Sequence, residues 1–95
     1  MIYHAINKIA GGKLLRVKIE ADEFISSINI TGDFFLHPED ALPFVEKKLA
    51  GLRAHETGQY YARIISEALE EQGATFIGVT AADIAQTICE AFASG

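Results

Sequence analysis

Gly32-Asp33-Phe34-Phe35-Leu36-His37-Pro38 divides this chain into two parts with different sequence patterns. The segments before it alternate apolar and polar residues, which is typical of β-strands, whereas the segments after it repeat apolar residues with a helical period. In an extended chain Phe34 and Phe35 point to opposite faces, so one sheet face cannot bury both rings. The sequence therefore predicts that one ring enters the core and that the other needs a second layer or a partner.

Three β-strands are predicted in the first part of the chain, over about residues 2–9, 13–21 and 24–36. Gly11-Gly12 is typical of a two-residue hairpin turn, because both central positions of such a turn favour positive φ. Asp22-Glu23 is interpreted as a second tight turn. Strands joined in this way form an antiparallel meander.

The two turns also predict the register, and with it the buried face of the sheet. A two-residue turn at Gly11-Gly12 sets His4 opposite Ile19, and the second turn sets Val17 opposite Ile28. The predicted inner face consists of Ile2, His4, Ile6, Leu15, Val17, Ile19, Ala21, Phe24, Ser26, Ile28 and Ile30. The predicted outer face is mixed, and is either solvated or docked; it consists of Tyr3, Ala5, Asn7, Arg16, Lys18, Glu20, Ser27, Asn29 and Thr31.

Three helices are predicted after the strands, over about residues 41–51, 58–72 and 81–93, from apolar residues spaced three and four apart. Pro43 falls in the first turn of the first helix, where its missing N–H costs no intrahelical hydrogen bond. Gly73 predicts the end of the second helix, and Thr80 with Asp83 forms a variant capping box before the third. The sequence thus predicts an α+β fold: a single domain, residues 1–95, with three helices packed on one face of a three-stranded antiparallel meander.

The composition argues against several classes of protein. Thirteen acidic and eight basic residues give a formal charge of −5, whereas a nucleic-acid-binding domain normally carries a basic stripe. No apolar run approaches the roughly 20 residues that a membrane span requires. The single cysteine, Cys89, excludes an internal disulfide and fits a reducing compartment. Since no secretory leader pattern is present, the expected location is the cytoplasm.

No set of side chains in the sequence suggests that this chain is catalytic by itself. Gly11-Gly12-Lys13 lacks the spacing of a phosphate-binding loop and precedes a strand rather than a helix. The three histidines show no metal-ligand spacing, so no metal site is predicted. Cys89 lies at the border of the apolar side of a helix, next to Glu90, and is interpreted as a packing residue rather than a nucleophile.

The candidate site is the corner that Lys13 forms with Gly32, Asp33, Phe34, Phe35 and Leu36. One interpretation is structural: Gly32 allows a close backbone approach at the strand end, and Asp33 caps the turn. The other is a protein interface, in which Phe35 and Leu36 offer apolar area while Lys13 and Asp33 set the orientation. Lys13 could also serve as a contact for an anion. The residues alone leave these alternatives open.

Three segments resemble the accessory C-terminal domain of lipoate–protein ligases: Gly11-Gly12-Lys13-Leu14-Leu15, Ile30-Thr31-Gly32-Asp33-Phe34-Phe35-Leu36-His37-Pro38 and Leu49-Ala50-Gly51-Leu52. The resemblance covers nearly the whole chain and implies a fold similar to that of sulfur-acceptor and iron–sulfur scaffold proteins. It implies that a large domain binds ATP and lipoate, with Mg²⁺, and carries out the chemistry. The accessory domain is then needed to activate lipoate to lipoyl-AMP, and much less for transfer to a lysine of the acceptor domain.

Because no catalytic domain precedes Met1, the resemblance implies the split form of the ligase. In that form this chain is a non-catalytic small subunit that binds no cofactor alone and forms a heterodimer with the catalytic large subunit. Lipoyl-acceptor domains are then indirect partners. One alternative is a sulfur-acceptor or iron–sulfur scaffold-like protein, which needs a reactive Cys89. Another is a self-associating interaction domain, which would cover Phe35 with a second copy.

Overall fold

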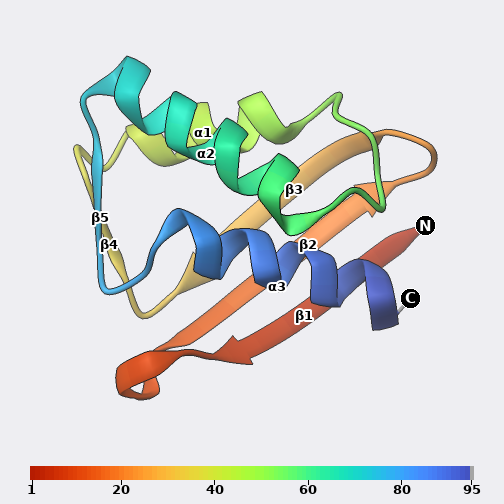
Figure 1. Cartoon of the computed structure of the whole chain (residues 1–95), viewed down its shortest axis with the longest axis horizontal. Coiled ribbons are helices and arrows are strands. Elements are labelled where there is room, and N and C mark those ends of the chain that lie inside the picture. The colour runs from red at the N-terminus through yellow and green to blue at the C-terminus, as the bar shows by residue number, and fades with distance from the viewer. Residues whose placement is uncertain (95) are drawn as a thin grey trace.

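The structure is a computed structural model that describes residues 1–94. Within these residues it has the α+β class predicted from the sequence, with three helices and a three-stranded antiparallel sheet in the order β1-β2-β3 (Figure 1). A second, two-stranded sheet of β4 and β5 was not expected. In chain order the elements are β1 (Ile2–Lys8), the 3-10 helix η1 (Ala10–Gly12), β2 (Leu14–Ala21), β3 (Ile25–Gly32), β4 (Phe35–His37), α1 (Ala41–Leu49), α2 (Gly58–Gln72), β5 (Thr75–Ile77) and α3 (Ala81–Ser94).

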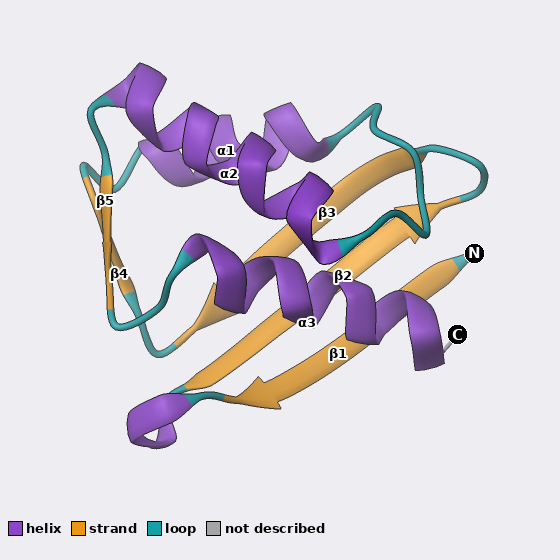
Figure 2. Cartoon of the chain, viewed as in Figure 1, coloured by secondary structure: helices purple, strands orange, loops and turns teal. Residues whose placement is uncertain are grey.

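The core lies between the larger sheet and the helices. α3 packs on β1 and β2, α1 packs on β3, and α2 packs against both α1 and α3 (Figure 2). The largest fully buried side chains include Leu15, Ile19, Ile25, Ile30, Leu49, Tyr61, Ile65, Ile84 and Ile88. Within residues 1–94 the opposite face of this sheet has no covering layer.

Local signals at the helix ends act largely as predicted. Gly73 ends α2 in the left-handed conformation, with a φ of 58°. The Thr80 backbone N–H donates to Asp83 Oδ2 at 3.0 Å, and the Asp83 N–H donates to Thr80 Oγ1 at 3.1 Å, which completes the capping box of α3. Asp40 precedes α1, but its side chain makes no capping hydrogen bond.

Strand β1 turns toward the core the face that was predicted to point away from it. Lys8 pairs with Leu14, so the connection to β2 spans residues 9–13 and contains η1 instead of a two-residue turn. Tyr3, rather than His4, lies opposite Ile19, and a one-residue slip exchanges the two faces of a strand. The inward side of β1 therefore carries Tyr3, Ala5 and Asn7, and its exposed side carries Ile2, His4 and Ile6.

The pairing of β2 with β3 is shifted by two residues from the prediction. Val17 lies opposite Ile30 rather than Ile28. Because a shift of two preserves the face, both isoleucines are buried as predicted. A β-bulge where the end of β2 pairs with the start of β3 places Ile25 in the core. The predictions that Phe24 and Ser26 lie on the inner face are therefore wrong, and both side chains are exposed.

The predicted strand 24–36 is divided into two strands, because the chain crosses between sheets after Gly32. Gly32 approaches the backbone of β2 so closely that a Cβ there would clash with the Leu14 carbonyl oxygen and lie 3.0 Å from Leu15 Cα. Beyond this crossing, β4 pairs with β5 in the small sheet at one end of the molecule (Figure 1). The segment between α2 and α3 thus contains a strand.

Candidate partner-binding site

The two-stranded ribbon of β4 and β5 presents an apolar pair to solvent. Phe35 lies directly opposite Ile77, and their side chains are 71% and 58% exposed. The next pair, Leu36 and Phe76, has the opposite orientation: Leu36 is buried and Phe76 is half-buried against the core. The ribbon therefore has one face that contributes to the core and one that exposes apolar area to solvent.

The two adjacent phenylalanines are separated as the alternation of an extended chain requires. The Phe34 ring is half-buried and packs edge-to-face on Phe76, with ring centroids 5.5 Å apart. Phe35 points away from the core and is the ring that the fold leaves exposed. Leu36 offers almost no surface, so the expectation that it adds apolar area to an interface is wrong. Ile77 takes that place, and sequence reasoning missed it because its partner strand lies some 40 residues earlier in the chain.

Gly32 and Asp33 have structural roles at the end of the larger sheet. The Asp33 N–H donates to the Leu14 carbonyl oxygen at 2.8 Å, and the Leu14 N–H donates to Asp33 Oδ2 at 3.2 Å. This reciprocal pair closes the ladder where the chain leaves β3. Asp33 therefore fixes the corner that aims the β4–β5 ribbon, while its side chain remains exposed.

The structure brings most of the predicted site residues together around one open depression of about 480 Å³. Its lining consists of Gly11, Lys13, Gly32, Asp33, Phe34 and Phe35. We call Lys13, Asp33, Phe35 and Ile77 the ribbon patch: two charges of opposite sign beside two exposed apolar side chains. Aromatic residues surrounded by few charges are typical of the centres of protein interfaces.

The environment of Cys89 does not favour a nucleophilic thiol. The side chain is half-buried in α3, and its Sγ donates to the Glu56 carbonyl oxygen at 3.6 Å. Burial, followed by the negative charge of Glu90, raises the pKa of this thiol. Within residues 1–94, moreover, no three His, Cys, Asp or Glu side chains gather in a way that could hold a metal ion.

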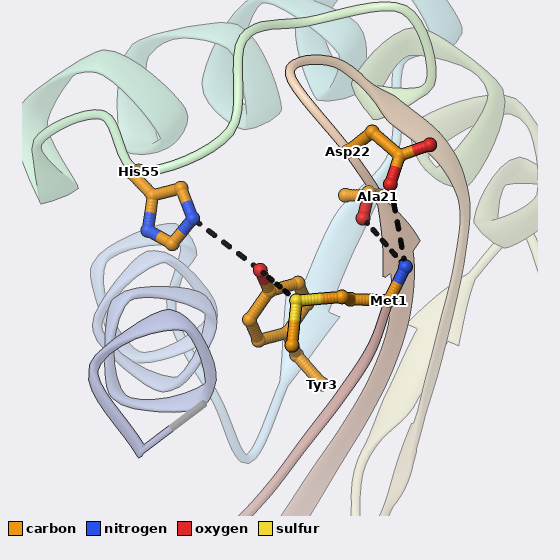
Figure 3. Close-up of polar contacts among 5 residues, drawn as sticks. All are labelled: Met1, Tyr3, Ala21, Asp22 and His55. Carbon is orange, nitrogen blue, oxygen red and sulfur yellow. Dashed lines mark hydrogen bonds and ion pairs between the residues drawn. The ribbon is translucent and has the colours of Figure 1, made fainter.

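His55 lies in a cluster of aromatic side chains. His55 contacts Tyr3, with 3.5 Å between His55 Nε2 and the phenolic oxygen (Figure 3). The Tyr3 ring also packs on Phe92. The Met1 ammonium donates to the Ala21 carbonyl oxygen at 3.1 Å beside this cluster. These contacts tie the start of β1 to the loop between α1 and α2, which is a structural role.

The comparisons with known proteins give one informative match. No protein-family model and no curated protein matches the chain, and no helix in residues 1–94 is both long and apolar enough to cross a membrane. A solved structure of a bipartite lipoate protein ligase and its E2 lipoyl domain, from Thermoplasma acidophilum, contains a chain that is 31% identical. The match covers 93% of this chain and 94% of that chain, with a TM-score of 0.74.

This chain belongs to the accessory-domain family of bipartite lipoate protein ligases. Because the match extends over nearly the full length of both chains, the similarity includes the sheets and the helices and is not confined to a single motif. Membership of this lipoate ligase family agrees with the resemblance carried by the Gly-Gly-Lys-Leu and Gly-Asp-Phe-Phe segments.

Proposed function

We propose that this chain is the non-catalytic small subunit of a two-part lipoate–protein ligase and is needed, with its large subunit, for ATP-dependent activation of lipoate. The observation that carries the proposal is the full-length similarity to a chain of the Thermoplasma bipartite ligase system. The exposed ribbon patch supports it, because a subunit of this kind needs a surface for its partner.

The proposal includes a division of labour between the two subunits. Burial raises the pKa of the Cys89 thiol, and residues 1–94 bring together no group of metal ligands. We therefore assign ATP, lipoate and Mg²⁺ to the large subunit. In the activation step a lipoate carboxylate oxygen attacks the α-phosphorus of ATP, lipoyl-AMP forms and pyrophosphate leaves. The small subunit would order and close the partner's site, which excludes water from the reactive mixed anhydride.

The ribbon patch is the proposed contact with the large subunit. Phe35 and Ile77 would form its apolar centre, and Lys13 with Asp33 would set the orientation of the two subunits. Acceptor lipoyl domains would be served indirectly, since the large subunit would transfer the lipoyl group to their lysine. The cytoplasmic location expected from the sequence stays a prediction.

The test is lipoyl-AMP formation by the candidate large subunit, with and without this chain, followed as lipoate-dependent release of pyrophosphate from ATP. We expect formation to require the chain and to saturate at one chain per large subunit. Phe35→Ala should lower it, whereas Phe24→Ala, which truncates another exposed phenylalanine at the far end of β3, should not. Lipoyl-AMP formation at the same rate without the chain would refute the proposal.

A further inference from the structure

The uncovered face of the larger sheet carries a distinct pattern of charge. Three cations and one carboxylate stand on this face, whereas the rest of the chain holds five cations and twelve carboxylates. These four residues are Lys8, Arg16, Lys18 and Glu20. A protein with a formal charge of −5 thus collects positive charge on the one face that its helices leave open.

The cations of this face are not used within the fold. Among the ion pairs formed by residues 1–94, none involves Lys8, Arg16 or Lys18. All three side chains are exposed. They are therefore available to carboxylates of another molecule.

Cross-strand pairing arranges the face in rows. One row runs from Ile6 through Arg16 to Thr31, and the next runs from His4 through Lys18 to Asn29. The six side chains line one open depression of about 310 Å³. Cations occupy the central strand, an apolar and an imidazole side chain lie on one side, and short hydrogen-bonding side chains lie on the other. Such a surface fits a protein surface that presents carboxylates beside apolar groups.

This face adjoins the ribbon patch. Thr31 ends one of the rows and is followed directly by Gly32, which lines the depression of the ribbon patch together with Lys13. The four side chains of the ribbon patch cannot supply the roughly 800 Å² per partner that a specific interface buries. A partner seated on the ribbon would have to extend over neighbouring surface, and the sheet face is continuous with it.

We propose that the open sheet face docks the catalytic large subunit, through carboxylates of that subunit that pair with Arg16 and Lys18. The inference rests on the proposed function, because it adds a second contact to the same heterodimer. A second copy of this chain is a poorer occupant in a symmetric, face-to-face arrangement, since the same cations would then meet one another. The large subunit should accordingly carry a cluster of Asp or Glu where this face docks.

The experiment measures the dissociation constant of the heterodimer by titration calorimetry at low and at moderate salt. We expect Arg16→Glu and Lys18→Glu each to weaken binding by about tenfold or more at low salt, and the effect to shrink as salt screens the charges. Lys47→Glu makes the same charge change on an exposed residue of α1 and should alter binding by less than about twofold. Arg16→Gln and Lys18→Gln give the same test with a smaller effect if a glutamate variant unfolds.

The outcomes separate the two proposals. A tight complex that tolerates both charge reversals would overturn this inference and leave the proposed function standing. Failure of the unchanged chain to bind the large subunit would overturn both. A change in the oligomeric state of the isolated chain upon Arg16→Glu, or specific binding of an oligonucleotide to the unchanged face, would also overturn the inference, because another occupant would then be shown.

Discussion

Truncation of Phe35 should weaken binding to the large subunit while leaving the isolated chain almost as stable as before. A phenylalanine side chain offers roughly 150–250 Å², and 71% of Phe35 is exposed. If the partner covers that area, Phe35→Ala removes on the order of 100 Å² of buried apolar surface, or about 2.5 kcal/mol at ~25 cal/mol per Å². Side-chain ordering offsets part of this, so we expect a loss of about 1–3 kcal/mol, a roughly 5- to 150-fold weaker heterodimer.

The same substitution should leave the isolated chain almost as stable as before. The Phe35 ring contributes to the fold through its cross-strand contact with Ile77, and such a pair is worth roughly 0.2–1 kcal/mol. Urea unfolding followed by circular dichroism would measure this change, and titration calorimetry with the large subunit would measure binding. Phe24→Ala is the matched control, since Phe24 is 48% exposed but lies near the other end of the sheet.

A double-mutant cycle adds a check on whether one partner covers both ribbon residues. Because Phe35 and Ile77 are directly opposite each other, a single partner pocket would take up both side chains, and the effects of Phe35→Ala and Ile77→Ala should not be additive. Unchanged affinity in both single variants would refute the assignment of the ribbon patch. If the isolated chain is a dimer that Phe35→Ala dissociates, the self-associating alternative is correct instead.

Three further predictions concern the stability of the fold and the reactivity of Cys89. Gly32→Ala should lower the free energy of unfolding, measured in urea, by about 2–4 kcal/mol, because the new methyl group clashes with the backbone of β2. Gly11→Ala is the control: its methyl group meets no atom within 4 Å, so it should cost about 1 kcal/mol, and equal losses in the two variants would contradict this reasoning. Burial raises the pKa of both Tyr61 and Cys89, because the folded chain disfavours their charged forms. The free energy of unfolding should therefore be unaffected by these two groups below about pH 8.5, the ordinary pKa of a thiol, and should fall as the pH rises above it. Alkylation of native Cys89 at neutral pH should likewise be slower than that of an unfolded control, and rapid labelling would favour the sulfur-acceptor alternative.

The helices were predictable from the sequence because their signals are local. The capping box of Thr80 and Asp83 and the left-handed Gly73 act within one turn of the chain, so their positions in the sequence suffice to place the helix ends. The face of β1 was not predictable in this way. A longer connection containing η1 moves the register by one residue, and the composition of Gly11-Gly12 does not distinguish it from a tight turn.

Contacts with distant elements decide which side of β1 is buried. Tyr3 packs its ring on Phe92, and Asn7 donates to Thr87 Oγ1 at 3.3 Å, both on α3. These interactions outweigh the greater hydrophobicity of the side that carries Ile2 and Ile6, and no local pattern reveals them. The one-residue shift in register also decides the composition of the proposed docking face, because it places His4 and Ile6 beside Arg16 and Lys18 on the open side of the sheet.

The candidate site was partly predictable for a related reason. Lys13 and Asp33 had to lie close together because the hairpin of β2 and β3 returns the chain to the same end of the sheet. The membership of Ile77 depended on the pairing of β4 with β5, which joins residues far apart in the sequence. Periodicity reports which residues share a strand face, but it does not report which strand lies beside it.

Under the proposed function this chain brings no catalytic groups of its own, and it would act on the activation step through the free energy of its association with the large subunit. If this chain raises the affinity of the large subunit for lipoyl-AMP by some factor, lipoyl-AMP must raise the affinity between the two subunits by the same factor, because binding free energies are reciprocal. A stable analogue of lipoyl-AMP should therefore tighten the heterodimer in titration calorimetry. If the analogue binds the large subunit equally well with and without this chain, the chain acts on the reaction barrier or on substrate entry, and closure around the adenylate is not its role.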